Sequence, residues 1–143
     1  MTNTIRRFAS VAGLVVLATL ITPLTAAAQH LPIMVQHVGT DPVGKKYVEE
    51  LGARLRSSDR YDITVSKDDA MLGLHLVSTD ANDKDAGAAS AIAITMTMGP
   101  AQSNTYMHTW VILVGRDRTE DMAAALIGAI DAAVAQLKRQ RTE

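Results

Sequence analysis

The chain has 143 residues, a formal net charge of −1 and no cysteine. Its length leaves room for one domain, and the lack of cysteine excludes disulfide bonds, thiol nucleophiles and cysteine-ligated metals. A mildly acidic chain without a cluster of basic residues is also a poor candidate for binding nucleic acid.

The first 28 residues have the layout of a secretory signal peptide. Arg6 and Arg7 precede an apolar stretch from Phe8 to Ile21, and small residues then lead up to Ala28. The apolar core of about 13 residues is shorter than the roughly 20 that a transmembrane helix needs. We therefore expect cleavage after Ala28 and export to the periplasm or the medium.

Cleavage would leave a single α/β domain at residues 29–143. The leader carries two arginines and no acid, so its loss would lower the net charge from −1 to −3. An uncleaved leader that anchors the chain in the membrane is the alternative. Lipid attachment is excluded because no cysteine stands at the cleavage site.

The first half of the expected domain has strand signals on both sides of one helix signal. Residues 31–38 alternate in polarity, which predicts a strand. Asp41 and Pro42 favour the start of a helix, and its apolar face is formed by Tyr47, Val48, Leu51 and Leu55. Strands are then predicted at 61–65 and at 70–77, the second of them an interior strand because only His75 interrupts its apolar sides.

The second half predicts a hairpin followed by a closing helix. Residues 80–87 are polar and rich in turn formers, which predicts a loop. Alternation predicts strands at 90–98 and 106–115, joined by a connection at 99–104. Thr119 can cap the last helix, which follows the helical period as far as Leu137.

The predicted order is therefore β-α-β-β-β-β-α. A helix between the first two strands makes them parallel, and the later strands form a meander, so the five-stranded sheet is mixed and mostly antiparallel. Each helix has one apolar stripe, which favours a two-layer α/β sandwich with both helices on one face. The other face would be solvated or covered by a partner. The first and last strands are expected to run antiparallel, which would place Asp41 and the charged junction at 117–121 at opposite ends of the sheet.

The four histidines do not predict a metal site. Three of them, His37, His75 and His108, fall on predicted strands, whereas His30 precedes the first strand. A three-histidine zinc site can be built on a sheet, but no pair has the spacing of a zinc motif. We expect no metal and no cofactor.

The remaining polar clusters predict no catalytic residues. In the acidic segment at 80–85, Lys84 and Asp85 stand where a calcium-binding EF-hand loop needs an oxygen ligand and a glycine. No serine has the Gly-x-Ser-x-Gly context of a nucleophile elbow. Glu120 and Asp121 oppose anion binding at the start of the last helix and are expected to favour its positive end. The sequence therefore predicts a protein that is not an enzyme.

Tyr106, His108 and Trp110 alternate along the last predicted strand and are expected to share one of its faces. They either pack beneath a helix, as clustered aromatic residues do in cores, or form an exposed stripe that binds a protein or a glycan. Both interpretations stay open at this point, and these three residues are the candidate binding residues.

One pattern in the first half resembles a known family. A helix with Leu51 and Leu55 is followed by Ser57 and Ser58, by Tyr61-x-Ile63, by an acidic turn and by Ala70 at the entry to a strand. In this pattern residues 40–77 resemble the small α/β domains of bacterial envelope assembly proteins, such as the N-terminal domain of TolB. The resemblance implies a non-enzymatic interaction module, although the lipidation cysteine of its lipoprotein members is missing here.

Together these features predict an exported envelope protein whose non-catalytic domain binds another protein of the cell envelope. It would not bind nucleic acid, and it would contact the membrane only through an uncleaved leader. The alternative is a periplasmic protein that binds a small ligand or a metal through its strand histidines.

Overall fold

The computed structural model describes residues 30–82, 84–99 and 105–140, so the predicted leader lies outside the described residues. The elements are β1 (Leu31–Val38), α1 (Pro42–Arg56), β2 (Tyr61–Ile63), β3 (Leu72–Asp80), β4 (Ala89–Met98), β5 (Thr105–Gly115), the 3-10 turn η2 (Arg116–Arg118) and α2 (Thr119–Gln140). Their order is the predicted β-α-β-β-β-β-α. Neither helix in this part of the chain combines the length and the apolar character needed to span a membrane.

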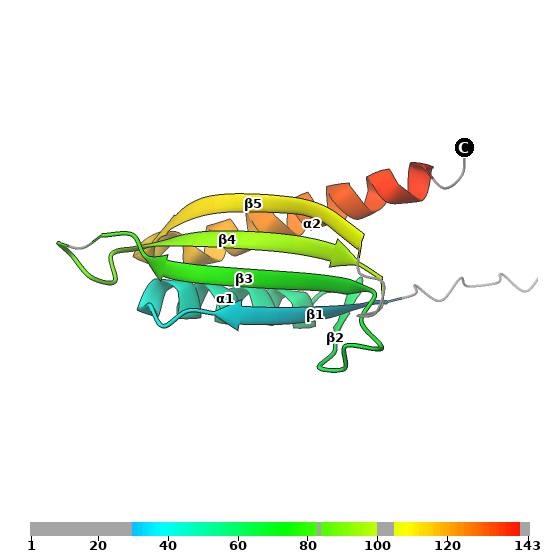
Figure 1. The fold of residues 1–143 in the computed structure, drawn as a ribbon, viewed down its shortest axis with the longest axis horizontal. Coiled ribbons are helices and arrows are strands. Elements are labelled where there is room, and N and C mark those ends of the chain that lie inside the picture. The colour runs from blue at the N-terminus through cyan, green and yellow to red at the C-terminus, as the bar shows by residue number, and fades with distance from the viewer. Residues whose placement is uncertain (1–29, 83, 100–104, 141–143) are drawn as a thin grey trace, which may run out of the picture.

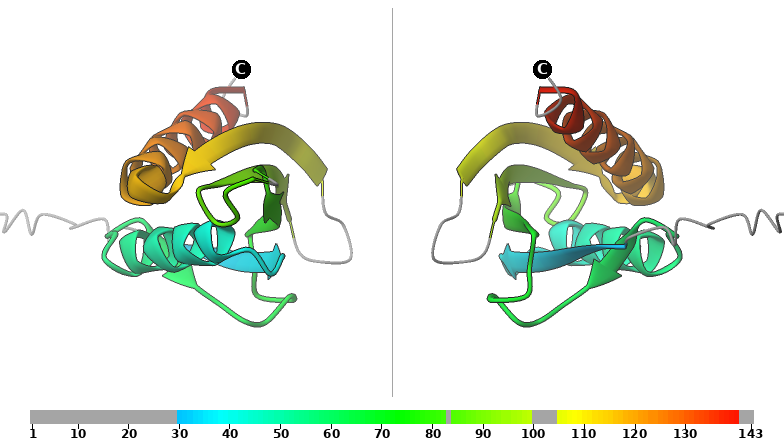
Figure 2. Two further views of the ribbon diagram at one scale, coloured as in Figure 1. Left: turned by 90° about the vertical axis from the view of Figure 1, so that its left-hand side faces the viewer. Right: turned by 90° about the vertical axis from the view of Figure 1, so that its right-hand side faces the viewer.

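The five strands form one mixed sheet in the order β2-β1-β3-β4-β5. β1 pairs in parallel with both β2 and β3, whereas β4 pairs antiparallel with β3 and with β5. In Figure 1 the sheet lies in front of both helices, and the turned views in Figure 2 place the helices in a second layer on one side. The predicted two-layer α/β sandwich with both helices on one face is confirmed.

The core lies between the two layers. It combines alternate residues of the strands with residues at helical spacing on α1 and α2, because only these positions face the other layer. Its members include Ile33, Leu72, Leu74, Leu76, Ile92, Ile94, Met96 and Val114 from the sheet, Tyr47, Leu51 and Leu55 from α1, and Ala123, Leu126 and Ile130 from α2.

α1 begins where its capping residues predict. The Asp41 side chain accepts a hydrogen bond from the Gly44 amide at 2.6 Å, and Pro42 occupies the first helical position. The carboxylate thus satisfies one of the N–H groups that a helix start leaves without an intrahelical partner.

The expectation that the first and last strands run antiparallel is wrong. β3 is parallel to β1, and the two antiparallel pairings that follow return β5 to the direction of β1. Each hairpin reverses the chain, so two successive hairpins restore its direction. The segments that follow β1 and β5 therefore meet at the same end, where the Lys46 ammonium donates a hydrogen bond to the Arg116 carbonyl at 3.5 Å.

β2 is shorter than the strand predicted at 61–65. It is an edge strand whose three residues pair with the first three residues of β1. The Thr64 amide still donates to the Ile33 carbonyl at 2.9 Å, but the chain then turns away and leaves Val65 96% exposed. Alternating polarity predicted a longer strand because Val65 continues the pattern without having a strand partner.

Candidate functional site

The face of the sheet opposite the helices carries an apolar band. Val38, Val77, Ala93 and Val111 are direct register partners on β1, β3, β4 and β5, so they form one row across four strands. Leu113 extends the row along β5. Val77 is 56% exposed and Val111 77% exposed, although cross-strand valines normally lie in a core. We refer to these five residues as the apolar band.

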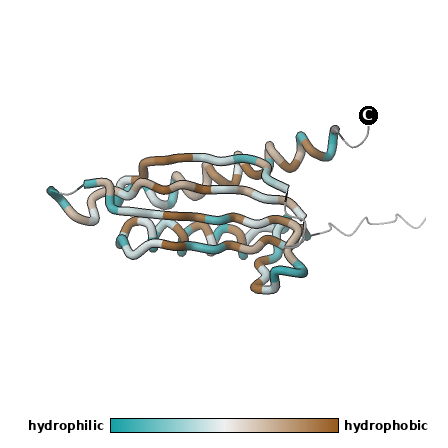
Figure 3. Tube along the Cα trace, viewed as in Figure 1, coloured by the Kyte–Doolittle hydropathy of each residue, from teal (hydrophilic) through white to brown (hydrophobic). Residues whose placement is uncertain are grey.

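The apolar band lies beside one polar row on the same face. Gln36, His75, Thr95 and Thr109 form the neighbouring row, in which the hydroxyls of Thr95 and Thr109 lie 3.2 Å apart. In Figure 3 the C-terminal half of β5 is hydrophobic and its N-terminal half is polar, which shows the boundary along one strand. Protein–protein interfaces also place polar residues next to apolar ones, and here the polar row lies along one side of the apolar band.

The three predicted binding residues do not share one face. A bulge between Met96 and Thr97 shifts the register, so that Thr97 pairs with Tyr106 and Met96 with His108. Successive residues of β4 point to opposite faces, so Tyr106 lies on the open face and His108 on the helix face with Trp110. The expectation of a single aromatic stripe is wrong because the extra residue of the bulge breaks the alternation along β5.

His108 and Trp110 form an aromatic pair at the edge of the sheet. Their ring centroids are 4.4 Å apart, and the ring planes are tilted by 53°. Trp110 packs half-buried against the core and His108 is exposed. Tyr106 is exposed on the opposite face. The binding of a partner by these side chains remains a prediction.

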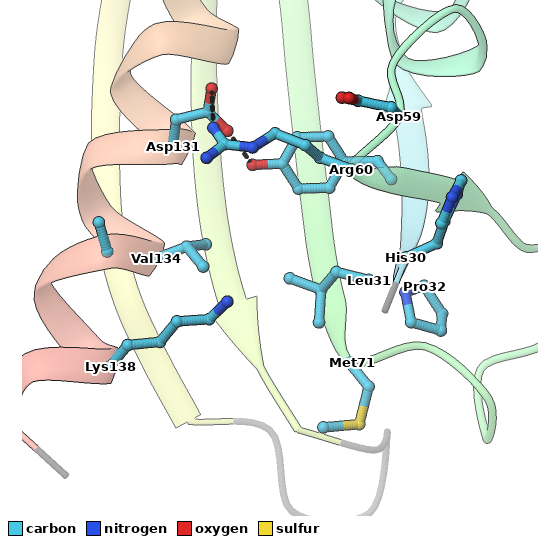
Figure 4. Close-up of a pocket in the computed structure, with 11 residues that line it drawn as sticks. His30, Leu31, Pro32, Asp59, Arg60, Met71, Asp131, Val134 and Lys138 are labelled. Atoms are coloured by element: carbon cyan, nitrogen blue, oxygen red, sulfur yellow. Dashed lines mark hydrogen bonds and ion pairs between the residues drawn. The ribbon is translucent and has the colours of Figure 1, made fainter. Parts of the chain in front are cut away.

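A groove of about 630 Å³ lies between the second half of α2 and the starts of β1 and β2. Figure 4 shows Asp131, Val134 and Lys138 of α2 on one wall and Leu31 and Met71 near the other. Sequence reasoning did not find this groove, because its walls are at least 60 residues apart in the chain and no motif marks them.

The polar groups of the groove hold the two layers together. The Asp131 carboxylate forms an ion pair with Arg60 at 2.8 Å and accepts a hydrogen bond from the Tyr61 hydroxyl at 2.5 Å. Burial raises the pKa of Tyr61, and the negative charge of Asp131 raises it further. The hydroxyl therefore stays a hydrogen-bond donor at neutral pH, and these contacts fasten α2 to the start of β2.

A serine, a histidine and an aspartate also meet at the start of α1. The Ser78 hydroxyl donates to Asp41 at 2.6 Å, and the His37 Nε2 atom lies 2.8 Å from the same hydroxyl oxygen. Since Ser78 gives its only hydrogen to Asp41, the His37 ring must donate to Ser78. In a catalytic triad the imidazole instead lies between the other two residues and takes the serine proton. The order found here suits a structural link between β1, β3 and α1.

The histidines lie in separate places. His30 contacts Asp62 at 3.1 Å, His37 contacts Ser78, and His75 lies on the open face, away from His108. Within residues 30–82, 84–99 and 105–140, no three His, Asp or Glu side chains come together in a way that could hold a metal ion. The acidic loop after β3 is tied internally, since the Asp80 carboxylate accepts from the amides of Asn82 and Gly87.

Comparison with solved structures relates the fold to that of TolB. Part of TolB from Acinetobacter baumannii matches 76% of this chain with a TM-score of 0.51 and 12% sequence identity. The match covers 30% of the TolB chain, so this protein spans about a third of the length of that relative. At this identity the likeness concerns the fold alone, and it agrees with the resemblance read from residues 40–77.

Two lipoprotein structures were also found, with lower scores. A minor lipoprotein from Acinetobacter baumannii has 12% identity and a TM-score of 0.46, with 72% of this chain and 94% of that chain covered. A putative lipoprotein from Caulobacter crescentus has 14% identity and a TM-score of 0.40, with 73% and 91% covered. These two scores are too low to indicate a shared fold. No protein-family model and no curated protein matches the sequence.

Proposed function

We propose that the protein is an exported, non-catalytic accessory protein of the bacterial envelope that binds another envelope protein through the open face of its sheet. The observation that carries the proposal is the apolar band, whose side chains lie exposed in one row across four strands. Contiguous apolar patches on soluble proteins mark interaction sites. The predicted leader and the resemblance of residues 40–77 to envelope domains support the location.

The shape of the surface favours a protein partner over a small ligand. Small molecules bind in concave pockets that bury most of their surface, whereas the apolar band runs across the face of a sheet. Polar side chains that could take part in catalysis instead form contacts that stabilise the fold, since Ser78 donates to Asp41 and Arg60 pairs with Asp131. This pairing supports a non-catalytic role.

The proposal is tested by site-specific photocrosslinking in cells that export the protein. A photoreactive residue at Val77, in the centre of the apolar band, should capture one defined envelope protein. The matched control carries the same residue at Glu49, which is exposed on α1 in the other layer. We expect an adduct at position 77 and none at position 49, because the two positions lie on opposite layers of the sandwich.

A substitution completes this test. Val77→Lys places a charge in the apolar band, and the exposed position leaves the core unchanged. We expect the partner to be lost from co-purification with Val77→Lys and retained with Glu49→Lys. Equal capture at positions 77 and 49, or full binding by Val77→Lys, would contradict the proposal.

A further inference from the structure

The two edges of the sheet are built differently. β2 has three residues and carries Asp62 next to Arg60, whereas β5 has eleven residues with no charged side chain and no proline. β5 ends the strand order, so in the described part of the chain its outer backbone groups face no further strand. Natural proteins protect exposed edges with short strands, charges or proline. β2 has such protection, and β5 has only the bulge near its start.

The side chains along the β5 edge are uncharged on both faces. Val111 and Leu113 are exposed on the open face, and His108 and Trp110 lie on the helix face. An uncharged strand of this length is a template for a further strand, because its backbone N–H and C=O groups are ready to extend the ladder.

The helix beside this edge has a matching uncharged side. Glu120 and Asp131 mark the side of α2 that faces α1, since they pair with Arg54 and with Arg60. At 100° per residue the opposite side carries small residues at successive turns, namely Ala125, which is exposed, Ala129, which is half-buried, and Ala133, which also packs against the edge of the core. α2 lies at the β5 end of the helix layer and α1 at the β1 end, so this side faces the same way as the β5 edge (Figure 2).

We propose that this flank, formed by the outer edge of β5 and the Ala125–Ala133 side of α2, binds a second copy of the chain. The two β5 strands pair antiparallel about a two-fold axis near the strand midpoint, Trp110. A two-fold interface must be complementary to itself, and an uncharged strand paired with its own copy opposes no like charges. The same axis brings the two α2 helices side by side, where alanines allow the close approach of packed helices.

The area of this flank matches a second copy of the chain better than a single peptide strand. Eleven residues at about 3.4 Å each give an edge of about 37 Å, and a sheet with one helix layer is about 20 Å thick. The flank therefore offers roughly 700 Å² per copy, or about 1,400 Å² in total, which lies within the range of stable protein complexes. A single added strand would cover only the sheet half of this flank.

Sedimentation equilibrium of the purified protein over a wide concentration range tests the proposal. We expect a reversible dimer. Val111 lies one residue from the proposed axis, so Val111→Lys places two lysines diagonally across the axis, within reach of each other, and should weaken the dimer by roughly tenfold or more. Val111→Glu should have the same effect, and an equal mixture of the two variants should form the heterodimer, because lysine then faces glutamate.

Val77→Lys is the matched control. It places the same charge on the same face but on β3, an interior strand, so the dimer should persist. This variant also separates the two proposals, since it should abolish partner binding through the apolar band and leave self-association intact. A protein that stays monomeric at every concentration would overturn the proposed dimer. So would equal loss of the dimer in Val77→Lys and Val111→Lys, which would indicate face-to-face association.

Discussion

Asp41 is 7% exposed and accepts hydrogen bonds at 2.6 Å from both the Gly44 amide and the Ser78 hydroxyl. Desolvation by burial would raise the pKa of this carboxyl, but the hydrogen bonds outweigh it and hold the pKa below its usual value. Two backbone segments approach Ser78 so closely that they need glycine. A Cβ atom at Gly39 or at Gly44 would lie 2.2 Å from the Ser78 hydroxyl oxygen. Asp41 thus joins the helix start to the centre of the sheet.

The lowered pKa predicts a pH-dependent contribution to stability. A carboxyl with a depressed pKa stabilises the fold above its unfolded value of 3.8, and this contribution is lost as the pH falls through the folded pKa. Asp41→Asn should lower the free energy of unfolding by about 1–3 kcal/mol near neutral pH. The difference from the wild type should be smaller at an acid pH below 3.8, because the folded carboxyl takes up its proton only below that value.

Urea denaturation at the two pH values measures this difference. Asp68→Asn, at an exposed position in a turn, is the matched control and should match the wild type near neutral pH. A loss in Asp41→Asn that is the same at both pH values would show that the charge of Asp41 does not contribute.

At the scale of elements, α2 is held at two points along its 22 residues. Glu120 pairs with Arg54 of α1 at 2.8 Å, and Asp131 receives both the Arg60 guanidinium and the Tyr61 hydroxyl. The first pair is exposed and contributes little. The contacts of Asp131 join α2 to the opposite edge of the sheet through the buried Tyr61. They therefore fix the position of the second half of the helix on the core.

Two tyrosines test this attachment. Tyr61→Phe removes the hydrogen bond to Asp131 and should lower the free energy of unfolding by about 1–2 kcal/mol. Tyr47 is the control, because it is fully buried in the same core and its hydroxyl has no hydrogen-bond partner among the described residues. Tyr47→Phe should leave stability unchanged or raise it by up to about 1 kcal/mol. Equal losses in thermal or urea unfolding would contradict a specific role for the Tyr61–Asp131 contact.

Local sequence patterns predict some features of the elements and miss others. The start of α1 at Asp41 and Pro42 was predictable, because capping depends on neighbours in sequence. The bulge opposite Met96 was not, since it depends on how β4 and β5 pair. For the same reason the alternation of Tyr106, His108 and Trp110 predicted one shared face, whereas the pairing divides them between two faces.

At the scale of the whole molecule, export is a prediction that rests on residues 1–28. We expect the protein recovered from the periplasm to begin at Gln29 by intact-mass spectrometry. Ala28→Arg should block cleavage and retain the longer chain in the membrane fraction, because the residue before the cut must be small. Ala27→Gln is the control and should be cleaved normally, since the middle position of an Ala-x-Ala site varies. Recovery of uncleaved wild-type protein in the cytoplasm would contradict export.

The fold class could be derived from the sequence because the order and type of the elements follow from local periodicity. The apolar residues of α1 and α2 repeat with the helical period and those of the strands alternate, which is sufficient for a two-layer α/β sandwich. The candidate surface needed the tertiary structure. Val38, Val77 and Val111 are ordinary strand residues in sequence, and only the register places them in one exposed row.

The sequence by itself thus determined the kinds of elements, their order and the lack of a catalytic motif. The tertiary structure decided that β1 and β5 point the same way, that Tyr106 lies on the face opposite Trp110, and that β5 is a long uncharged edge. The physical reason is that propensity and polarity act within a few residues. Strand register and the covering of each face depend on pairings between residues that are distant in the chain.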